Sequence, residues 1–300
     1  MSSPAPRAPR ILITGRNGQL GWALERAFAT AGDVFAFDHD ALDLTDADAI
    51  RRCCNEVKPT LILNAGAYTA VDRAEQEPEL AMQINGAAPR VLSEEANRLG
   101  AALIHYSTDY VFSGDATTPY VEEDLTAPQN VYGKTKLAGE RAVCEVADRF
   151  LVFRTSWVYA ARRQNFLLTM LRLAREREEL RVVADQIGSP TWVQTLADVS
   201  RAAIDKDGSL KIADGIYHVS AGGRTSWHGF AEAIFAAIAD PGRIVKRVTP
   251  IATADFPAPA KRPAFSVLSN QKIELAMNMR VPEWQQQLAG CAAELNSGKV

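Results

Sequence analysis

The chain has 300 residues, of which 47% are hydrophobic and 23% charged, as in globular proteins of about two domains. Its 33 basic and 36 acidic side chains leave a net charge of -3, which provides no broad attraction for nucleic acid or for an anionic membrane. No apolar run reaches the roughly 18 residues that cross a bilayer, and residues 1–10 lack the apolar core of a signal peptide. We therefore expect a cytoplasmic protein that begins with a flexible leader over residues 1–9.

The cysteines and histidines exclude two further classes of protein. The four cysteines show no CxxC spacing, so the sequence predicts neither a disulfide framework nor a zinc site. The four histidines are scattered without the spacing of metal ligands, and we assign no metal site through them.

Short apolar runs alternate with longer segments of helical periodicity in the first half of the chain. The expected strands are residues 11–14, 34–37, 61–63, 102–106 and 151–153, each short and almost wholly apolar, as in strands buried on both faces. The expected helices are residues 20–31, 46–57, 81–99 and 131–146. This alternation predicts an α/β protein built on a Rossmann-type doubly wound parallel sheet.

The regular alternation ends near residue 154. We expect helices over residues 166–179 and 196–205, with an irregular stretch over 184–194 between them. Pro250, Pro257, Pro259 and Pro263 predict an ordered loop rather than a regular element. The expected organisation is a Rossmann domain over residues 10–154, joined by part of 195–222, and a mainly substrate-binding, smaller mixed α/β lobe over 155–300.

A glycine-rich turn joins the first expected strand to the first expected helix. Gly15, Gly18 and Gly21 follow each other at a spacing of three. Gly15 permits the tight turn, Gly18 lets the backbone approach a pyrophosphate, and Gly21 lets the helix pack against the strand. Amide groups at the start of that helix would face the phosphates. The sequence therefore predicts an NAD(P)-binding site here.

Two side chains bear on the choice of dinucleotide. Asp38 follows the second expected strand, where a carboxylate accepts hydrogen bonds from ribose hydroxyls and favours NADH. Arg16 lies inside the glycine turn, where a guanidinium can reach a 2′-phosphate and favour NADPH, or can be a solvated loop charge. The residues leave NADPH and NADH both open.

Tyr132 and Lys136 lie four residues apart on an expected helix and therefore share one of its faces. A neighbouring ammonium group favours the phenolate, so we expect Lys136 to make Tyr132 a better proton shuttle. Ser107, Thr108 and Asp109 lie at the carboxyl end of the fourth expected strand, the edge at which open α/β sheets bind ligands. A hydroxyl group there can hydrogen-bond a substrate carbonyl.

In this order, the glycine turn, Ser107-Thr108-Asp109 and Tyr132-x-x-x-Lys136 resemble the extended short-chain dehydrogenase/reductase superfamily. Further segments resemble the dTDP-4-dehydrorhamnose reductase family over residues 10 to near the C-terminus. They are GQLGW (18–22), NAGAYTAVD (64–72), HYSTDYVF (105–112), YGKTKLAGE (132–140), RTSWVY (154–159), DQIGSPT (185–191) and RP (262–263).

The resemblance implies an oxidoreductase that uses NADPH or NADH. The implied reaction is the reduction of the C4 ketone of dTDP-4-dehydro-L-rhamnose to dTDP-L-rhamnose, the last step of dTDP-rhamnose biosynthesis, which supplies cell-surface polysaccharide. Thr108, Tyr132 and Lys136 would be the catalytic residues. Hydride would pass from the nicotinamide to C4 while Tyr132 delivers the proton.

The remaining expected site residues fall into a cofactor set and a substrate set. The resemblance implies that the dinucleotide is lined by Gly18, Gln19, Leu20, Asp38, Asp43, Leu44, Ala67, Tyr68, Thr69 and Tyr106. Neighbouring positions complete the cofactor set with Gly15, Arg16, Asn17, Ala65, Gly66, Tyr132 and Lys136. The resemblance places Thr108, Asp109 and Trp157 against the sugar nucleotide, and the other expected substrate contacts are Val71, Tyr110, Asn165, Phe166, Gln186 and Arg262.

Some of these assignments have structural alternatives. Trp157 can stack on the ligand or be a core aromatic, and Phe166 begins a periodic helix that can bury it. Arg262 can grip two phosphate oxygens of the substrate diphosphate, or can be solvated.

Some family members are described as dimers bridged by a divalent cation through glutamates, but this chain departs from that pattern. Ala23 and Gln194 stand where carboxylates would be needed, and neutral side chains bind Mg²⁺ poorly. We therefore expect no bridging Mg²⁺, and either a monomer or a homodimer.

Two other functions fit parts of the pattern. The first is a nucleotide-sugar epimerase or dehydratase that returns hydride to its own NAD. A dehydratase of this type carries an acidic pair, whereas Asp109 is followed here by Tyr110. The second is a non-catalytic, dinucleotide-binding regulatory subunit, against which the intact Thr108, Tyr132 and Lys136 argue.

Overall fold

The computed structural model describes residues 8–297, and of the expected leader over residues 1–9 it therefore describes only the last two. A six-stranded sheet in the order β2-β1-β3-β4-β5-β10 forms its centre, and every neighbouring pair is parallel. The strands are β1 (Arg10–Thr14), β2 (Asp33–Phe37), β3 (Leu61–Asn64), β4 (Ala102–Thr108), β5 (Phe150–Thr155) and β10 (Gly215–His218). The prediction of a Rossmann-type parallel sheet is confirmed.

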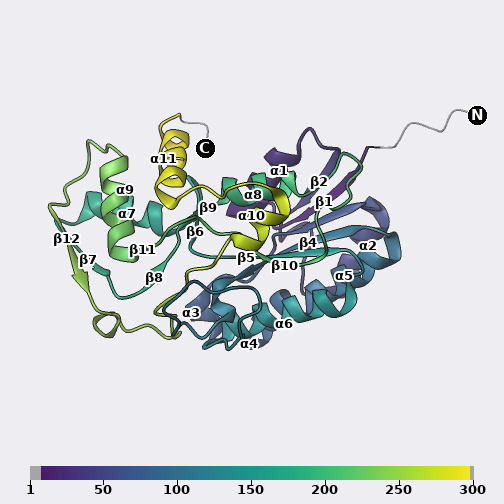
Figure 1. The fold of residues 1–300 in the computed structure, drawn as a ribbon, viewed down its shortest axis with the longest axis horizontal. Coiled ribbons are helices and arrows are strands. Elements are labelled where there is room, and N and C mark those ends of the chain that lie inside the picture. Colours follow the sequence, from purple (N-terminus) through teal and green to yellow (C-terminus); the bar gives the residue numbers. More distant parts are fainter. Residues whose placement is uncertain (1–7, 298–300) are drawn as a thin grey trace, which may run out of the picture.

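Helices cover both faces of this sheet (Figure 1). On one face, α1 (Gln19–Phe28) packs against α8 (Val193–Ala202), and both bury apolar side chains on Ile11 and Ile13. The other face is covered by α2 (Ala47–Val57), α5 (Ala88–Leu99) and α6 (Val131–Val146), over a core that includes Leu12. Ile11 and Leu12 therefore point to opposite faces, as successive residues of a strand must.

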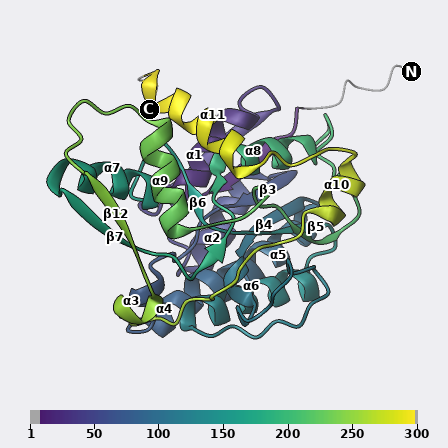
Figure 2. The ribbon, with the colours of Figure 1, turned by 60° about the vertical axis from the view of Figure 1, so that its left-hand side comes forward.

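A second lobe with its own apolar core lies beside the sheet (Figures 1 and 2). Its paired strands are β6 (Val158–Tyr159) with β9 (Thr191–Trp192), β7 (Glu179–Val183) with β12 (Arg247–Ile251), and β8 (Ile187–Gly188) with β11 (Thr225–Ser226). Among the remaining helices, α7 (Phe166–Glu176), α9 (Trp227–Ala237) and α11 (Trp284–Asn296) surround that core, whereas α10 (Gln271–Met277) packs near β10.

Four sequence-based expectations for the second half were wrong in detail. The stretch over 184–194 contains β8 and β9, the helix expected over 196–205 is α8 at Val193–Ala202, and the one expected over 166–179 ends at Glu176. Pro250 lies inside β12, opposite Val182 of β7, rather than in a loop. A strand of a two-stranded sheet has one open edge, so the missing amide of a proline there removes no ladder bond.

The helix expected over 81–99 is also interrupted. The structure has α4 (Pro78–Met82), a π-helical turn (Gln83–Ala87) and then α5. Pro89 has no amide hydrogen, and its ring would crowd the carbonyl of Asn85 in a regular helix, which the wider turn avoids. The turn also directs the Asn85 side chain toward Tyr68 and Thr135, next to the site described below.

No helix within residues 8–297 is long and apolar enough to span a membrane. The four cysteines, all of which lie in that range, form no disulfide.

Candidate active site

The glycine turn has the geometry that its residues require. Gly15 has φ +72°, and a Cβ atom there would lie 2.8 Å from the Gly66 Cα. A Cβ atom on Gly21 would lie 2.1 Å from the Gly15 carbonyl oxygen, so a side chain at either position is excluded. Gly18 caps α1, and within residues 8–297 no side chain caps this helix end. The backbone amides of the first turn therefore face a cradle that fits a dinucleotide pyrophosphate.

The loop after β3 forms the wall opposite this turn. The Gly66 amide donates to the Thr14 hydroxyl at 3.0 Å, and that hydroxyl donates to Asn64 Oδ1 at 2.7 Å. The Tyr68 amide donates to the Asn85 carboxamide at 2.9 Å, which fixes the next part of the loop. The expected cofactor residues Ala65, Gly66, Ala67 and Tyr68 thus follow β3 directly beside the turn.

The expected adenosine end of the site is held by exposed polar contacts. Asp38 accepts hydrogen bonds from the Asn17 side chain at 2.6 Å and from the Ala41 amide at 3.1 Å. Arg16 instead pairs with Glu25, at 3.0 and 2.9 Å from its two carboxylate oxygens. This places Asp38 beside the turn and directs the Arg16 guanidinium along α1.

The other expected cofactor residues are more dispersed. Asp43 accepts from the amide and hydroxyl of Thr45, and the Leu44 side chain lies against Gly66. Leu20 packs against the core below α1. Tyr106 directs its phenol to the Ser200 hydroxyl on α8, at 2.7 Å, so only its backbone faces α6. Of the rest, Val71 begins the short helix α3 (Val71–Ala74), and Thr69 is exposed.

The three expected catalytic residues converge where β4 ends and α6 begins. Thr108 is the last residue of β4, and its hydroxyl faces the Tyr132 phenol. Asn130 caps α6 by accepting from the Gly133 amide at 2.8 Å, which fixes the turn that carries Tyr132. One turn further along, Lys136 donates to the Tyr106 carbonyl oxygen at 2.6 Å. β4 thus contacts both members of the Tyr-x-x-x-Lys pair.

The pKa of Tyr132 moves in the direction opposite to the one expected. Burial raises the pKa of the Tyr132 phenol to about 12, although the neighbouring Thr108 hydroxyl opposes the rise. Burial also lowers the pKa of Lys136 to about 8, against the influence of the Glu140 carboxylate. Desolvation thus outweighs the expected effect of the Lys136 charge on the phenol. Tyr132 remains protonated near neutral pH, which suits a proton donor.

Glu140 received no role from the sequence, yet it is buried at this site. It accepts hydrogen bonds from the Ser107 hydroxyl and from Arg154, whose Nη2 lies 2.8 Å away. The four-residue spacing of Tyr132, Lys136 and Glu140 was the available signal, because it places all three on one face of the helix. This face is joined to β4 at three successive turns.

Three expected substrate residues gather around Trp227, which sequence reasoning missed. The indole of Trp157 stacks on that of Trp227, with ring centres 3.5 Å apart and planes 3° apart. The ring centres of Phe166 and Trp227 lie 4.6 Å apart, and Gln186 Oε1 accepts a hydrogen bond from the Trp227 ring nitrogen at 3.2 Å. Trp157 has φ +47°, an uncommon backbone conformation for a bulky residue. The aromatic side chains thus form one cluster at the edge of the second lobe.

The remaining expected substrate residues lie on either side of the catalytic residues. Asn165 donates to the Gln19 side chain at 2.9 Å, joining the second lobe to the glycine turn. Asp109 is buried beside Thr108, and burial raises its carboxyl pKa to about 6. Tyr110 packs edge-on against Tyr132, with ring centres 5.6 Å apart. Arg262 lies in the C-terminal segment and pairs with Asp72 of α3.

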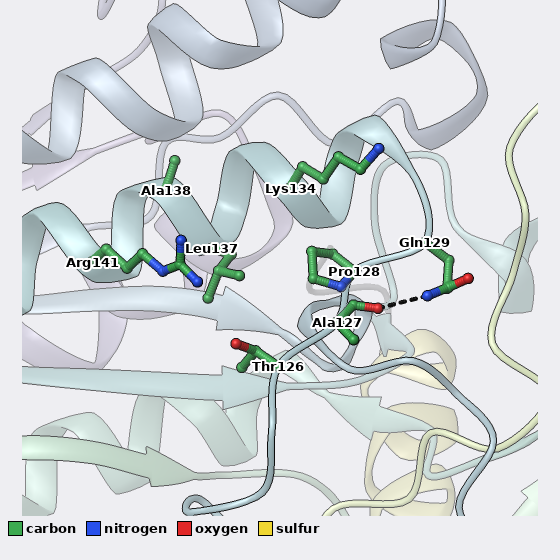
Figure 3. A pocket seen from close by; sticks show the side chains of 8 residues that line it. All are labelled: Thr126, Ala127, Pro128, Gln129, Lys134, Leu137, Ala138 and Arg141. Carbon is green, nitrogen blue, oxygen red and sulfur yellow. Dashed lines mark hydrogen bonds between the residues drawn. The ribbon is translucent and has the colours of Figure 1, made fainter.

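A separate groove of about 410 Å³ follows α6 (Figure 3). Lys134, Leu137, Ala138 and Arg141 line it from the helix, opposite the loop over 126–129. At 100° per residue these positions fall on the side of α6 away from Lys136, so the groove is distinct from the catalytic face. Within residues 8–297, no group of three or more acidic, cysteine or histidine side chains could hold a metal ion.

Comparison with known proteins identifies the family. The family model described as "RmlD substrate binding domain" matches residues 9–297. The dTDP-4-dehydrorhamnose reductase of Burkholderia thailandensis is 45% identical over 296 residues, which cover 96% of this chain and 99% of that protein.

Solved structures agree in fold and in sequence. The chain superposes on a dTDP-4-dehydrorhamnose reductase from Clostridium acetobutylicum with a TM-score of 0.88 at 40% identity, over 95% of this chain and 99% of the other. It also superposes on the enzyme from Bacillus anthracis, solved in complex with NADP, with a TM-score of 0.89 at 39% identity and the same coverage of each chain. The chain belongs to the dTDP-4-dehydrorhamnose reductase family.

Proposed function

We propose that this protein reduces the C4 ketone of dTDP-4-dehydro-L-rhamnose to dTDP-L-rhamnose with NADPH or NADH. The observation that carries the chemistry is the convergence of Thr108, Tyr132 and Lys136 beside an open glycine cradle. Membership of the family supports the substrate, and the NADP complex of the Bacillus anthracis relative supports the cofactor.

In the proposed reaction, the glycine turn and the loop after β3 would hold the reduced dinucleotide, whose nicotinamide would supply a hydride to C4. Thr108 and Tyr132 hydrogen-bond the ketone oxygen and stabilise the negative charge that develops on it. Tyr132 then gives its phenolic proton to that oxygen, so one hydride and one proton convert the ketone to the alcohol. Lys136 orients the ribose and places a positive charge near the phenol that has lost its proton. Lys136 is buried and Tyr132 is half-buried, which limits the access of water to the transfer.

The cofactor is expected along the glycine turn, Asp38 and the loop after β3, and the sugar nucleotide between Asp109, the Trp157 cluster and Arg262. The proposed cofactor domain comprises residues 10–154 with α8 and β10, which pack on or extend the central sheet. Residues 155–300 would contribute mainly to the substrate lobe. We further propose a cytoplasmic enzyme, in the compartment where nucleotide sugars are made, acting as a monomer or homodimer.

The test is the loss of reduced-nicotinamide absorbance when purified protein meets dTDP-4-dehydrorhamnose, generated in place from dTDP-glucose. NADPH and NADH are tested separately. Stoichiometric oxidation with dTDP-L-rhamnose as product is the expected result. Turnover of a nucleotide sugar without net cofactor consumption would instead favour an epimerase or dehydratase, and dinucleotide binding without turnover would favour a regulatory subunit.

A further inference from the structure

The C-terminal segment runs past the site and forms an ion pair and hydrogen bonds with the sheet domain there. In Figure 2 it leaves β12, passes α3 and continues to α10. Arg262 in this segment meets Asp72 of α3, 190 positions away in the sequence, with its Nη2 2.7 Å from Oδ2 and its Nη1 3.1 Å from Oδ1. This two-point ion pair joins two distant segments of the chain beside the catalytic residues.

The remaining contacts of Arg262 show which hydrogens of its guanidinium stay available to bind a ligand. Nη1 also donates to the carbonyl oxygen of Ala260 at 3.2 Å, so both Nη1 hydrogens are used. Nη2 uses one hydrogen on Asp72, and within residues 8–297 Nε makes no hydrogen bond. One Nη2 hydrogen and the Nε hydrogen therefore remain. Together they form the side edge of the guanidinium, the fork that grips two oxygens of a carboxylate or phosphate.

Other contacts fix the segment and locate Arg262 relative to the reaction centre. The Ala260 amide donates to Asp72 Oδ1 at 3.1 Å, and Asn130, the cap of α6, donates to the Lys261 carbonyl at 2.8 Å. The Arg262 charge opposes the rise in the pKa of the Tyr110 phenol, so the two groups are close. Tyr110 in turn packs against Tyr132. Arg262 is therefore placed one side chain away from the proposed proton donor.

We infer that Asp72 is a positioning residue for the nucleotide diphosphate: it holds the end of the Arg262 guanidinium so that the side edge is presented to the substrate phosphates. Asp72 is not displaced by the substrate in this arrangement, because the two acceptors use different edges. The inference rests on the proposed function for the presence of a nucleotide diphosphate.

The experiment measures binding rather than turnover. The dissociation constants of dTDP, dTMP and thymidine are measured by calorimetry on the full chain with saturating NADP⁺, for the wild type and for Asp72→Asn. Removing the charge that aligns Arg262 is expected to weaken dTDP binding about tenfold, the size of one charge-assisted hydrogen bond. Thymidine binding is expected to remain unchanged, and dTMP binding to change less than dTDP binding.

Two further variants separate positioning from a structural role. In an Arg262→Gln background, Asp72→Asn is expected to cause no additional loss of dTDP affinity, since no guanidinium remains to be held. The matched control is Asp240→Asn, because Asp240 makes a comparable two-point pair with Arg175, at 2.7 and 3.1 Å, outside the site. This control is expected to leave all three affinities unchanged.

The inference is overturned if Asp72→Asn leaves dTDP affinity intact, or weakens dTDP and thymidine equally. An equal loss in the Arg262→Gln background would overturn it too. Failure of the proposed function looks different. A wild-type protein whose dTDP affinity depends on Asp72 and Arg262 as described, but which does not oxidise NAD(P)H with the ketosugar, would refute the reaction and leave the role of Asp72 standing.

Discussion

The ammonium group of Lys136 lies 2.6 Å from the backbone carbonyl oxygen of Tyr106. One turn before it on α6, Tyr132 meets the last residue of β4, and one turn after it, Glu140 accepts a hydrogen bond from β4 as well. Three successive turns of the helix are thus bonded to residues 106–108. This register sets where the phenol and the ammonium group lie relative to the carboxyl edge of the sheet.

Replacing Tyr132 with phenylalanine removes the proposed proton donor and little else. We expect kcat to fall by about 10²- to 10⁴-fold, the usual contribution of a general acid. The dissociation constant of NADPH, measured by fluorescence titration, should stay within about twofold because the glycine cradle is untouched. Wild-type turnover in this variant would contradict the assignment.

Tyr217→Phe is the matched control for that prediction. The Tyr217 side chain lies largely buried on β10, and its hydroxyl donates to the Ala213 carbonyl, away from the catalytic residues. Losing one hydrogen bond of this kind costs about 1 kcal/mol of unfolding free energy. We expect a small decrease in stability and unchanged kcat.

The alkaline limit of activity should report on Lys136. Its pKa is lowered to about 8, whereas the pKa of Tyr132 is raised to about 12, so Lys136 is the first of the two to lose its proton as pH rises. His105, which also faces Lys136, has its pKa lowered by burial well below the usual range and stays neutral throughout. We expect kcat/KM to decline above about pH 8.

Glu140→Gln should move that alkaline limit to lower pH. The Glu140 carboxylate favours the charged form of Lys136, so its removal lets burial lower the pKa of the lysine further. The single variant leaves Arg154 as a buried cation without its carboxylate partner, which costs about 3–5 kcal/mol. The double variant Glu140→Gln with Arg154→Met avoids that cost. An alkaline limit that stays at the wild-type pH in both variants would refute this role of Glu140.

Trp227→Leu tests whether the stacked indoles hold the sugar nucleotide site. Trp157 keeps a positive φ and stacks on Trp227, so truncating Trp227 should release Trp157 from its orientation. We expect KM for the sugar nucleotide to rise about tenfold with a smaller change in kcat, and the near-UV circular dichroism to lose intensity. An aromatic pair contributes about 0.5–1.5 kcal/mol beyond its buried area, which is consistent with this size.

A control on the same helix separates this effect from a general loosening of the lobe. Phe235 lies on α9 and packs at the margin of the second core. Phe235→Leu should lower stability without raising KM. Equal increases in KM for the two variants would show that Trp227 acts only through the stability of α9.

Local spacing alone predicts two parts of the candidate site. The glycines at positions 15, 18 and 21 and the pair Tyr132 and Lys136 each lie within one turn or helix, so periodicity alone places them together. The carboxyl edge of the sheet could be predicted as well, because short apolar strands alternate with helices.

The contacts that sequence reasoning missed join distant segments of the chain. Trp227 follows β11, which pairs with β8, and the Trp157 indole lies against Gly188 of β8. Two-residue strands have no period to detect. Asp72 and Arg262 are joined by the path of the C-terminal segment, which no local pattern specifies. The direction of the Tyr132 pKa shift was missed for a related reason, since burial is a property of the folded site.

The preference between NADPH and NADH should depend on Glu25 through Arg16. The two side chains form an ion pair in which the Arg16 side chain is 51% exposed, so the pair is weak and a 2′-phosphate can compete for the guanidinium. Glu25→Gln should therefore raise kcat/KM for NADPH a few-fold relative to NADH. Arg16→Ala should lower that ratio about tenfold by removing the phosphate contact, with kcat/KM for NADH unchanged.

The control is Arg52→Ala, because Arg52 is an exposed arginine of α2 that pairs with Asp46. This variant should leave the ratio at its wild-type value. If Arg16→Ala lowers kcat/KM equally for both cofactors, the guanidinium supports the glycine turn rather than reading the 2′-phosphate, and Asp38, beside the turn, becomes the residue that sets the preference.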